Sequence, residues 1–125
     1  MTGSFFDATL RGLASAMSLH ERRHEVLASN LANVETPGFR ARDLDFGTAL
    51  REAFAEPTDP ALALDPERAA SVIEDPNTPA RADGNTVDLE LQMVQLTANS
   101  GRYNTLARLL GKRLGILRAA IEGSR

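Results

Sequence analysis

The fold is decided by the stretch Phe6–Phe39, which reads FDATLRGLASAMSLHERRHEVLASNLANVETPGF. Its seam positions recur in alternating steps of four and three residues over about four heptads, the period of a helix packed lengthwise on a partner helix. The pattern stops at Thr36-Pro37-Gly38, where proline lacks the N–H that a helix needs and Gly38 supplies the positive φ of a type II turn. We therefore predict an N-terminal helix over residues 1–34 that needs a partner helix, with the seam Phe6, Leu10, Leu13, Met17, His20, His24, Leu27, Leu31 and Val34.

A second seam of the same period predicts that partner over residues 84–122. Asn85 or Thr86 is the expected N-cap, and Asp88 and Glu90 place negative charge at the positive end of the helix dipole. The expected fold is mainly α, with two long terminal heptad helices forming an antiparallel coiled-coil hairpin. The second seam consists of Leu89, Met93, Leu96, Ser100, Tyr103, Ala107, Leu110, Leu114, Leu117 and Ile121.

The segment between the two helices divides into two parts of one domain that spans residues 1–125. Residues 35–55 are predicted to form the turn and a short helix near 44–54, capped by Asp43 and with Phe46, Leu50 and Phe54 on one face. Residues 56–83 hold five of the six prolines and are predicted to be an acidic loop, with one turn of helix around 67–73 as the only regular structure. No strand is predicted.

Composition excludes several classes of function. The chain has no cysteine, so a disulfide framework or a Cys-based metal site is excluded. The C-terminal arm is basic but has no interleaved aromatic residues and only one lysine, Lys112, which argues against nucleic-acid binding. No apolar run is long enough to span a bilayer, and the N-terminus does not resemble a secretory signal. These features predict a cytoplasmic protein, or one exported by a route that needs no cleaved leader.

The charge is unevenly distributed along the chain. Residues 43–83 carry ten acidic and three basic side chains, whereas residues 84–125 carry three acidic and six basic ones. The acidic middle either steers subunits toward one another or is simply a solvated loop, and the sequence leaves both open.

The C-terminal helix carries more apolar surface than one partner helix can cover. A further stripe and a row of small side chains follow the helical period, and each interior glycine costs roughly 1 kcal/mol relative to alanine. We predict that this surface packs on neighbouring subunits, the alternative being a weakly specified C-terminal helix. The predicted subunit-packing residues are Leu106, Leu109, Gly111, Gly115 and Ile116.

His20-Glu21-Arg22-Arg23-His24 matches the zinc-protease pattern H-E-x-x-H. A catalytic zinc needs a third protein ligand, and the chain has no other histidine. Both histidines also fall on the predicted seam, where a partner helix would cover them, so they are better explained as polar seam residues facing Asn99 and Ser100. We predict no metal, no cofactor, no small-molecule substrate and no enzymatic activity.

Residues 27–39, LASNLANVETPGF, closely resemble the N-terminal signature of bacterial flagellar rod, hook and hook-associated axial proteins. Three further segments resemble one branch, the FlgB family of proximal rod proteins: residues 41–46, residues 83–90 and Asn99-Ser100-x-x-Tyr103. The signature residues are Asn30, Asn33, Thr36, Pro37, Gly38 and Phe39.

The resemblance implies a structural subunit of the flagellar rod in the periplasm, exported by the flagellar type III apparatus. It implies self-assembly through terminal helices around a central channel. The implied partners are copies of itself, other rod proteins, and the ring and export-gate components at the rod base. The signature would end the first helix and shape a contact with the next subunit. The rival interpretation is a small cytoplasmic helical adaptor or export chaperone, which would have no reason to contain this signature.

Overall fold

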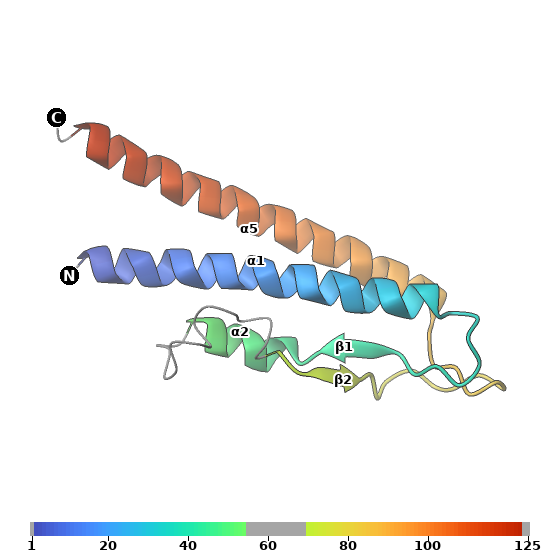
Figure 1. Cartoon of the computed structure of the whole chain (residues 1–125). Coiled ribbons are helices and arrows are strands. Elements are labelled where there is room, and N and C mark those ends of the chain that lie inside the picture. Colours follow the sequence, from blue (N-terminus) through green and yellow to red (C-terminus); the bar gives the residue numbers. More distant parts are fainter. Residues whose placement is uncertain (1, 55–69, 124–125) are drawn as a thin grey trace.

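The two terminal helices run antiparallel along the whole molecule (Figure 1). A computed structural model describes residues 2–54 and 70–123, without the side chains of residues 2–6. Its elements are α1 (Thr2–Ala32), β1 (Arg42–Leu44), α2 (Phe46–Phe54), β2 (Val72–Glu74) and α5 (Leu89–Gly123). The predicted mainly helical fold, with long first and last helices packed together and a short helix between them, is confirmed. The part of the predicted loop that covers residues 56–69 lies outside the described residues.

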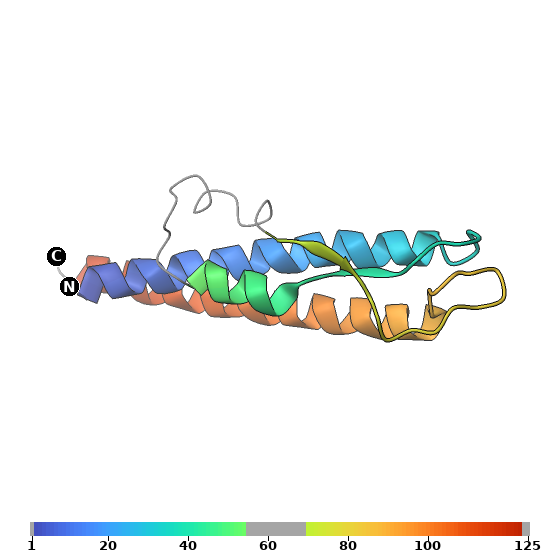
Figure 2. The same ribbon diagram turned by 90° about the horizontal axis from the view of Figure 1, so that it is seen from below.

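Helix α1 is the centre of the fold because it is buried on two sides. One side packs on α5, and the other packs on α2 and β1 (Figure 1). Seen from below, α2 and the two strands lie in front of the pair of long helices (Figure 2). The seam residues Leu13 and Leu27 are buried as predicted, but so are Ala16, Leu19 and Val26, which the single seam omitted. His24 was predicted to lie in the seam, and this is wrong: its side chain is exposed. A helix flanked on two sides buries a broader stripe than the heptad alone marks.

Helix α2 lies against the middle of α1 with the predicted apolar face, since Phe54 contacts Gly12 and Phe46 contacts His20. Phe54 packs directly over Gly12, where a Cβ atom would lie 2.4 Å from two ring carbons of Phe54. The expectation that Asp43 caps α2 is wrong, because the helix begins three residues later, at Phe46. Asp43 instead accepts a hydrogen bond from the Leu44 backbone N–H over 2.7 Å and forms an ion pair with Arg23.

Two short strands occur where none was predicted, one before α2 and one in the predicted loop. Strands β1 and β2 pair antiparallel, with Arg42 opposite Glu74 and Leu44 opposite Val72. The expected absence of strands was therefore wrong, and so was the turn of helix where it covered Val72 and Ile73. Strands of three residues are too short to show the alternation by which strands are recognised in a sequence.

Helix α5 is rotated relative to the predicted seam. Leu96, Tyr103, Leu110 and Leu117 lie on the side that faces α1, and all four are half-buried. The other positions of the α5 seam lie one residue earlier in the sequence than predicted. Gln92, Asn99, Leu106 and Arg113 are the less exposed set, whereas Met93, Ser100, Ala107 and Leu114 are exposed. Polar Gln92 and Asn99 can be buried because each has a hydrogen-bond partner on α1.

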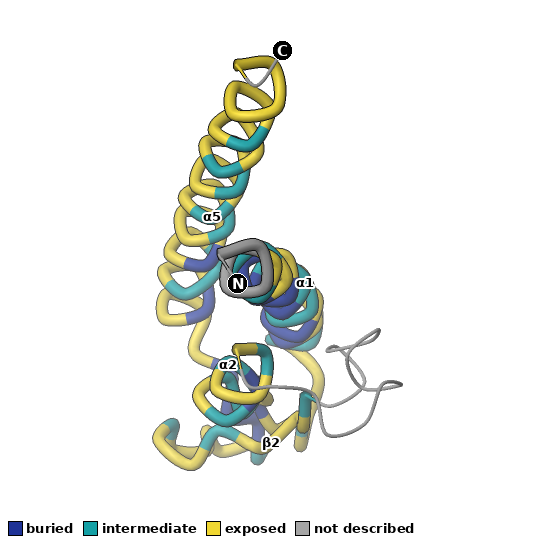
Figure 3. The backbone as a smooth tube through the Cα atoms, turned by 90° about the vertical axis from the view of Figure 1, so that its left-hand side faces the viewer, coloured by how far each residue is buried: buried dark blue, intermediate teal, exposed yellow. Residues whose placement is uncertain are grey.

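The helices separate toward the chain ends, so the last half of α5 stands away from the rest of the molecule (Figures 1 and 3). Gln92 and Asn99 are the only buried residues among the described side chains of α5. Within the described ranges 2–54 and 70–123, neither long helix contains a window apolar enough to cross a membrane.

Candidate assembly site

The signature residues lie at the closed end of the molecule, which is the end where α1 finishes and α5 begins. Asn33 ends the helix, since its side-chain amide donates to the Ser29 carbonyl over 2.8 Å and its Oδ1 accepts from the Thr36 hydroxyl over 3.1 Å. The Phe39 N–H donates to the Thr36 carbonyl over 3.3 Å, and Gly38 has a φ of 73°. These are the features of a type II turn, so the predicted positive φ at Gly38 is confirmed.

Asn30 joins three elements. Its side chain is buried, and its amide donates to the Arg42 carbonyl over 2.6 Å and to Oε1 of Gln92 over 3.0 Å. Its Oδ1 accepts from the Arg42 N–H over 3.0 Å. One asparagine therefore fixes the last turns of α1 against both β1 and the start of α5.

Asn85 holds the turn from the other side. It is fully buried, and its amide nitrogen lies within hydrogen-bond distance of the carbonyl oxygens of Asn33, Val34 and Thr36, at 2.9, 3.1 and 2.7 Å. Its Oδ1 accepts from the Val87 N–H over 2.7 Å. The carbonyls at a helix end have no partner within the helix. Here each of the three accepts from Asn85 and also from a second donor, which is the Thr36 N–H, the Arg81 guanidinium or the Phe39 N–H.

Residues 81–87 pair with the turn along their backbone as well. The Thr86 N–H donates to the Phe39 carbonyl over 2.9 Å, and the Thr86 hydroxyl accepts from the Ala41 N–H over 2.7 Å. Gly38 donates to the Asp83 carbonyl over 2.9 Å. A Cβ atom on Gly84, whose φ is 82°, would lie 3.5 Å from Cα of Gly38, so the two backbones touch.

The segment before α5 was predicted to cap that helix, and the structure corrects this. Helix α5 begins at Leu89, and Oδ1 of Asp88 accepts from the Leu91 N–H over 3.0 Å, as an N-cap residue does. Asn85 and Thr86 serve the turn instead. Arg81, which the sequence analysis did not single out, donates to the carbonyls of Val87 and Val34 and closes the same network.

The remaining signature residues sit on the surface of this network. Thr36, Pro37 and Gly38 are exposed and Phe39 is half-buried, whereas Asn30 and Asn33 lie beneath them. Every buried side-chain nitrogen or oxygen among the described residues has a hydrogen-bond partner. The arrangement is a rigid backbone surface supported by satisfied polar groups, which suits a contact site and offers no reactive group.

The H-E-x-x-H stretch makes two hydrogen-bonded contacts with α5 and one with β1. Nδ1 of His20 donates to Oδ1 of Asn99 over 2.7 Å, as expected for a seam histidine facing Asn99. Glu21 accepts from the Tyr103 hydroxyl over 3.0 Å, and this bond raises the pKa of Tyr103. Arg23 makes two hydrogen bonds to the Asp43 carboxylate, at 3.0 and 2.9 Å.

Burial lowers the pKa of His20 below its ordinary value. The bond to Asn99 opposes that shift, and the nearby cations Arg23 and Arg102 add to it. The His20 ring also packs on Phe46, with 4.5 Å between ring centroids. No group of three or more metal-ligating side chains occurs in the described part of the chain.

The predicted subunit-packing residues lie at the other end of the molecule, on the half of α5 that leaves α1. Leu109 is 45% exposed and Ile116 is 59% exposed. Gly111 and Gly115 are also exposed, and a Cβ atom on either would meet nothing within 4 Å. Leu106 differs, because it is half-buried and lines an open groove of about 580 Å³ between α1, α2 and α5. The structure therefore does not bring this surface and the signature together.

Comparison with known proteins gives one consistent relationship. Residues 10–40 match the family model of the flagella basal body rod protein. The flagellar basal body rod protein FlgB of Escherichia coli (strain K12) is 35% identical over an alignment of 134 positions. The alignment covers 94% of this chain and 96% of that protein. FlgB of Cereibacter sphaeroides is 37% identical, with 88% and 91% covered, and FlgB of Salmonella typhimurium is 31% identical, with 94% and 95% covered.

Proposed function

Because the chain belongs to the FlgB family of flagellar basal body rod proteins, we propose that it contributes two contact surfaces, one at each end, to the rod of which it is a structural subunit. The protein assembles with other components of the flagellar basal body. Its role is mechanical, with no catalytic step, cofactor or small-molecule substrate.

The observation that carries this proposal is the uncovered apolar surface of α5. Leu109 and Ile116 lie on one side of α5, and Leu114 and Ile121 lie on another. Each of the four is at least 45% exposed, on a helix whose last half has left its partner. Burying one such side chain contributes roughly 1.5–3 kcal/mol, so a neighbouring subunit that covers several of them gains substantially. Exposed apolar surface of this kind marks a protein-interaction site.

The second contact surface is the signature turn. Thr36, Pro37, Gly38 and Phe39 present backbone and one aromatic ring, and Asn30 and Asn33 hold that backbone in place. A surface fixed before binding loses little conformational entropy when a neighbour docks on it. The contact partner of this turn is the next subunit of the rod.

Membership of the family also supports a proposal for the partners of this chain, its export route and its place in the rod. The partners are copies of this chain, adjacent rod proteins, and the ring and export-gate components at the rod base. The subunit is exported by the flagellar type III apparatus and reaches its place in the periplasmic rod, where its terminal helices surround the export channel and transmit torque.

The test is whether the chain enters the rod and is required there. A strain that lacks its own copy is complemented with the chain carrying a small epitope tag, and basal bodies are isolated. The proposal predicts restored swimming and tagged chain in the basal-body fraction. Recovery of the tagged chain only in the cytoplasmic fraction, with swimming restored, would favour an adaptor or export chaperone.

A further inference from the structure

Helix α5 presents two exposed patches on one side, five turns apart. The acidic patch consists of Glu90, Leu91 and Val94, and the basic patch consists of Arg108, Leu109, Lys112 and Ile116. Glu90 and Arg108 differ by 18 positions, as do Leu91 and Leu109, which corresponds to five turns of 3.6 residues. The two patches therefore point in the same direction from the helix axis.

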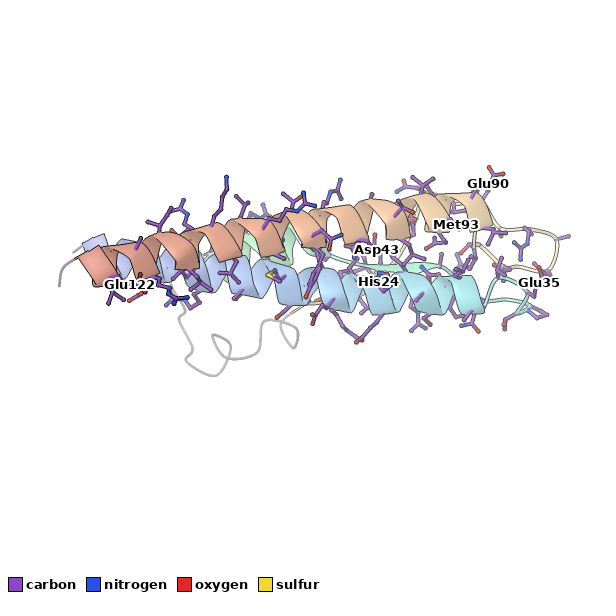
Figure 4. All side chains as sticks on the ribbon, turned by 90° about the horizontal axis from the view of Figure 1, so that it is seen from above. His24, Glu35, Asp43, Glu90, Met93 and Glu122 are labelled. Atoms are coloured by element: carbon purple, nitrogen blue, oxygen red, sulfur yellow. The ribbon has the colours of Figure 1, made fainter. Side chains whose placement is uncertain are left out.

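Each patch also contains apolar side chains that are exposed in the isolated chain. Val94 is 65% exposed, and Leu91, Leu109 and Ile116 are also exposed. Between residues 89 and 101, α5 carries one charge, that of Glu90, with Asp88 immediately before it. Between residues 102 and 118 it carries five basic residues and no acidic one. Glu90 lies at the closed end of the molecule, near Glu35, whereas the basic half extends toward Glu122 at the other end (Figure 4).

We propose that the acidic patch of one copy docks on the basic patch of a second copy, through parallel α5 helices staggered by about five turns. This inference rests on the proposed function, in which α5 contacts neighbouring subunits. A stagger of 18 residues shifts one copy along the other by about 27 Å, since each helical residue rises 1.5 Å. Glu90 of one copy then lies level with Arg108 of the next.

Opposite charge specifies the register of this contact. Neither Glu90 nor Arg108 nor Lys112 forms an ion pair with another described residue, so all three are available to a neighbour. A parallel pair without the stagger would place the basic halves side by side, where like charges repel. Because the two surfaces in contact differ, a growing row keeps one free patch at each of its two ends, which is the property of an open assembly.

A closed antiparallel dimer would also bring opposite charges together. It would use both patches of both copies at once and leave nothing for a third copy. The staggered arrangement is the one proposed because it leaves a patch free for a further copy at each end of the row.

The absence of cysteine makes the contact testable by disulfide cross-linking of the full chain. Val94→Cys and Lys112→Cys are made in separate chains, mixed at high concentration and mildly oxidised. We expect the mixture to form at least tenfold more cross-linked dimer than either chain alone. The control pair is Ser100→Cys with Arg118→Cys, which are also exposed and 18 positions apart but lie on another side of α5. Equal cross-linking by the control pair would overturn the proposal.

A chain that carries both Val94→Cys and Lys112→Cys separates the open row from the closed dimer. The staggered contact predicts a ladder of oligomers on a non-reducing gel, whereas a product that stops at the dimer contradicts it. Charge reversal adds a second criterion: Glu90→Lys and Arg108→Glu should each reduce cross-linking between the Val94→Cys and Lys112→Cys chains, and the two together should restore it. Failure of the combined variant to recover contradicts the pairing.

The same strains distinguish failure of this contact from failure of the proposed function. If the tagged chain enters the basal body but the cysteine pair does not cross-link there, the rod role stands and the staggered contact is wrong. If the chain does not enter the basal body at all, the proposed function itself fails.

Discussion

His20 and Asn99 join α1 to α5 through two reciprocal hydrogen bonds. Nδ1 of His20 donates to Oδ1 of Asn99 over 2.7 Å, and the Asn99 amide donates to the His20 carbonyl over 2.7 Å. Asn99 is also the last buried residue among the described side chains of α5. Beyond this pair the described side chains of α5 are at most half-buried, and the Tyr103 hydroxyl still donates to Glu21 of α1.

Hydrogen exchange should follow this division of α5. In the isolated chain we expect strong protection of amides in residues 93–103 and weak protection in residues 107–121, because the outer half has few buried contacts to resist local opening. Exchange measured by mass spectrometry on peptides from both halves gives the comparison. Uniform protection along α5 in a dilute monomer would show that the outer half is stable without a neighbour.

Acidification should weaken the pairing of α1 with α5. The pKa of His20 is lowered in the folded chain, so the unfolded chain binds the proton more readily. The stability contributed by neutral His20 is complete above the unfolded value of about 6.5 and is lost as pH falls toward the lower folded value. Thermal unfolding between pH 7.5 and 5 should show this loss, and His20→Gln should reduce it. His24→Gln, at an exposed position, is the control and should behave like the unmodified chain.

Removing the Asn85 side chain should open the signature turn. Asn85→Ala removes one donor from each of the carbonyls of Asn33, Val34 and Thr36 and removes the acceptor of the Val87 N–H, and we expect a loss of about 1–3 kcal/mol in the free energy of unfolding. Asn104→Ala, on the exposed surface of α5, should change stability by less than about 0.5 kcal/mol. Urea unfolding of the two variants provides the test, and equal midpoints would mean that the turn does not depend on Asn85.

Two glycines in the long helices should respond oppositely to alanine. At Gly12 an added Cβ would meet the Phe54 ring at 2.4 Å, so Gly12→Ala should displace the end of α2 and destabilise the chain by roughly 1–3 kcal/mol. At Gly101 nothing lies within 4 Å, so Gly101→Ala should stabilise the isolated chain by about 1 kcal/mol through helix propensity. Stabilisation by Gly12→Ala would show that Phe54 does not need that space.

The sequence predicted the parts of the fold that depend on heptad spacing and on the proline and glycine of the turn. The heptads located α1 and α5, and Thr36-Pro37-Gly38 located the turn, because proline and glycine act on the backbone directly. The rotation of α5 was missed because Gln92 and Asn99 are polar, and a seam drawn through apolar residues passes over them. Only their partners, Asn30 and His20 on another helix, make their burial favourable.

The candidate site was predicted as a motif but not as a structure. Asn30 and Asn33 were recognised from the signature, whereas the network that joins them to residues 81–87 depends on contacts between segments about 50 positions apart. A signal was present in Asp83-Gly84-Asn85-Thr86, whose residue types suit turns as well as helix caps. The helix-cap interpretation was favoured because a long helix follows directly, and the adjacent turn was not visible in the sequence.

The central claim is that the outer face of α5 is buried by a neighbour in the rod, and one pair of variants tests it most directly. In a strain that lacks its own copy, cells expressing Ile116→Asp should retain normal amounts and helicity of the purified chain but lose swimming, because the neighbour's surface would face a buried carboxylate. Leu110→Asp, on the half-buried side that faces α1, should lower the helicity of the chain itself. Swimming is measured in soft agar, and circular dichroism is measured on each purified variant. Loss of swimming with intact helicity for Ile116→Asp is the predicted result; normal swimming of those cells would contradict the account.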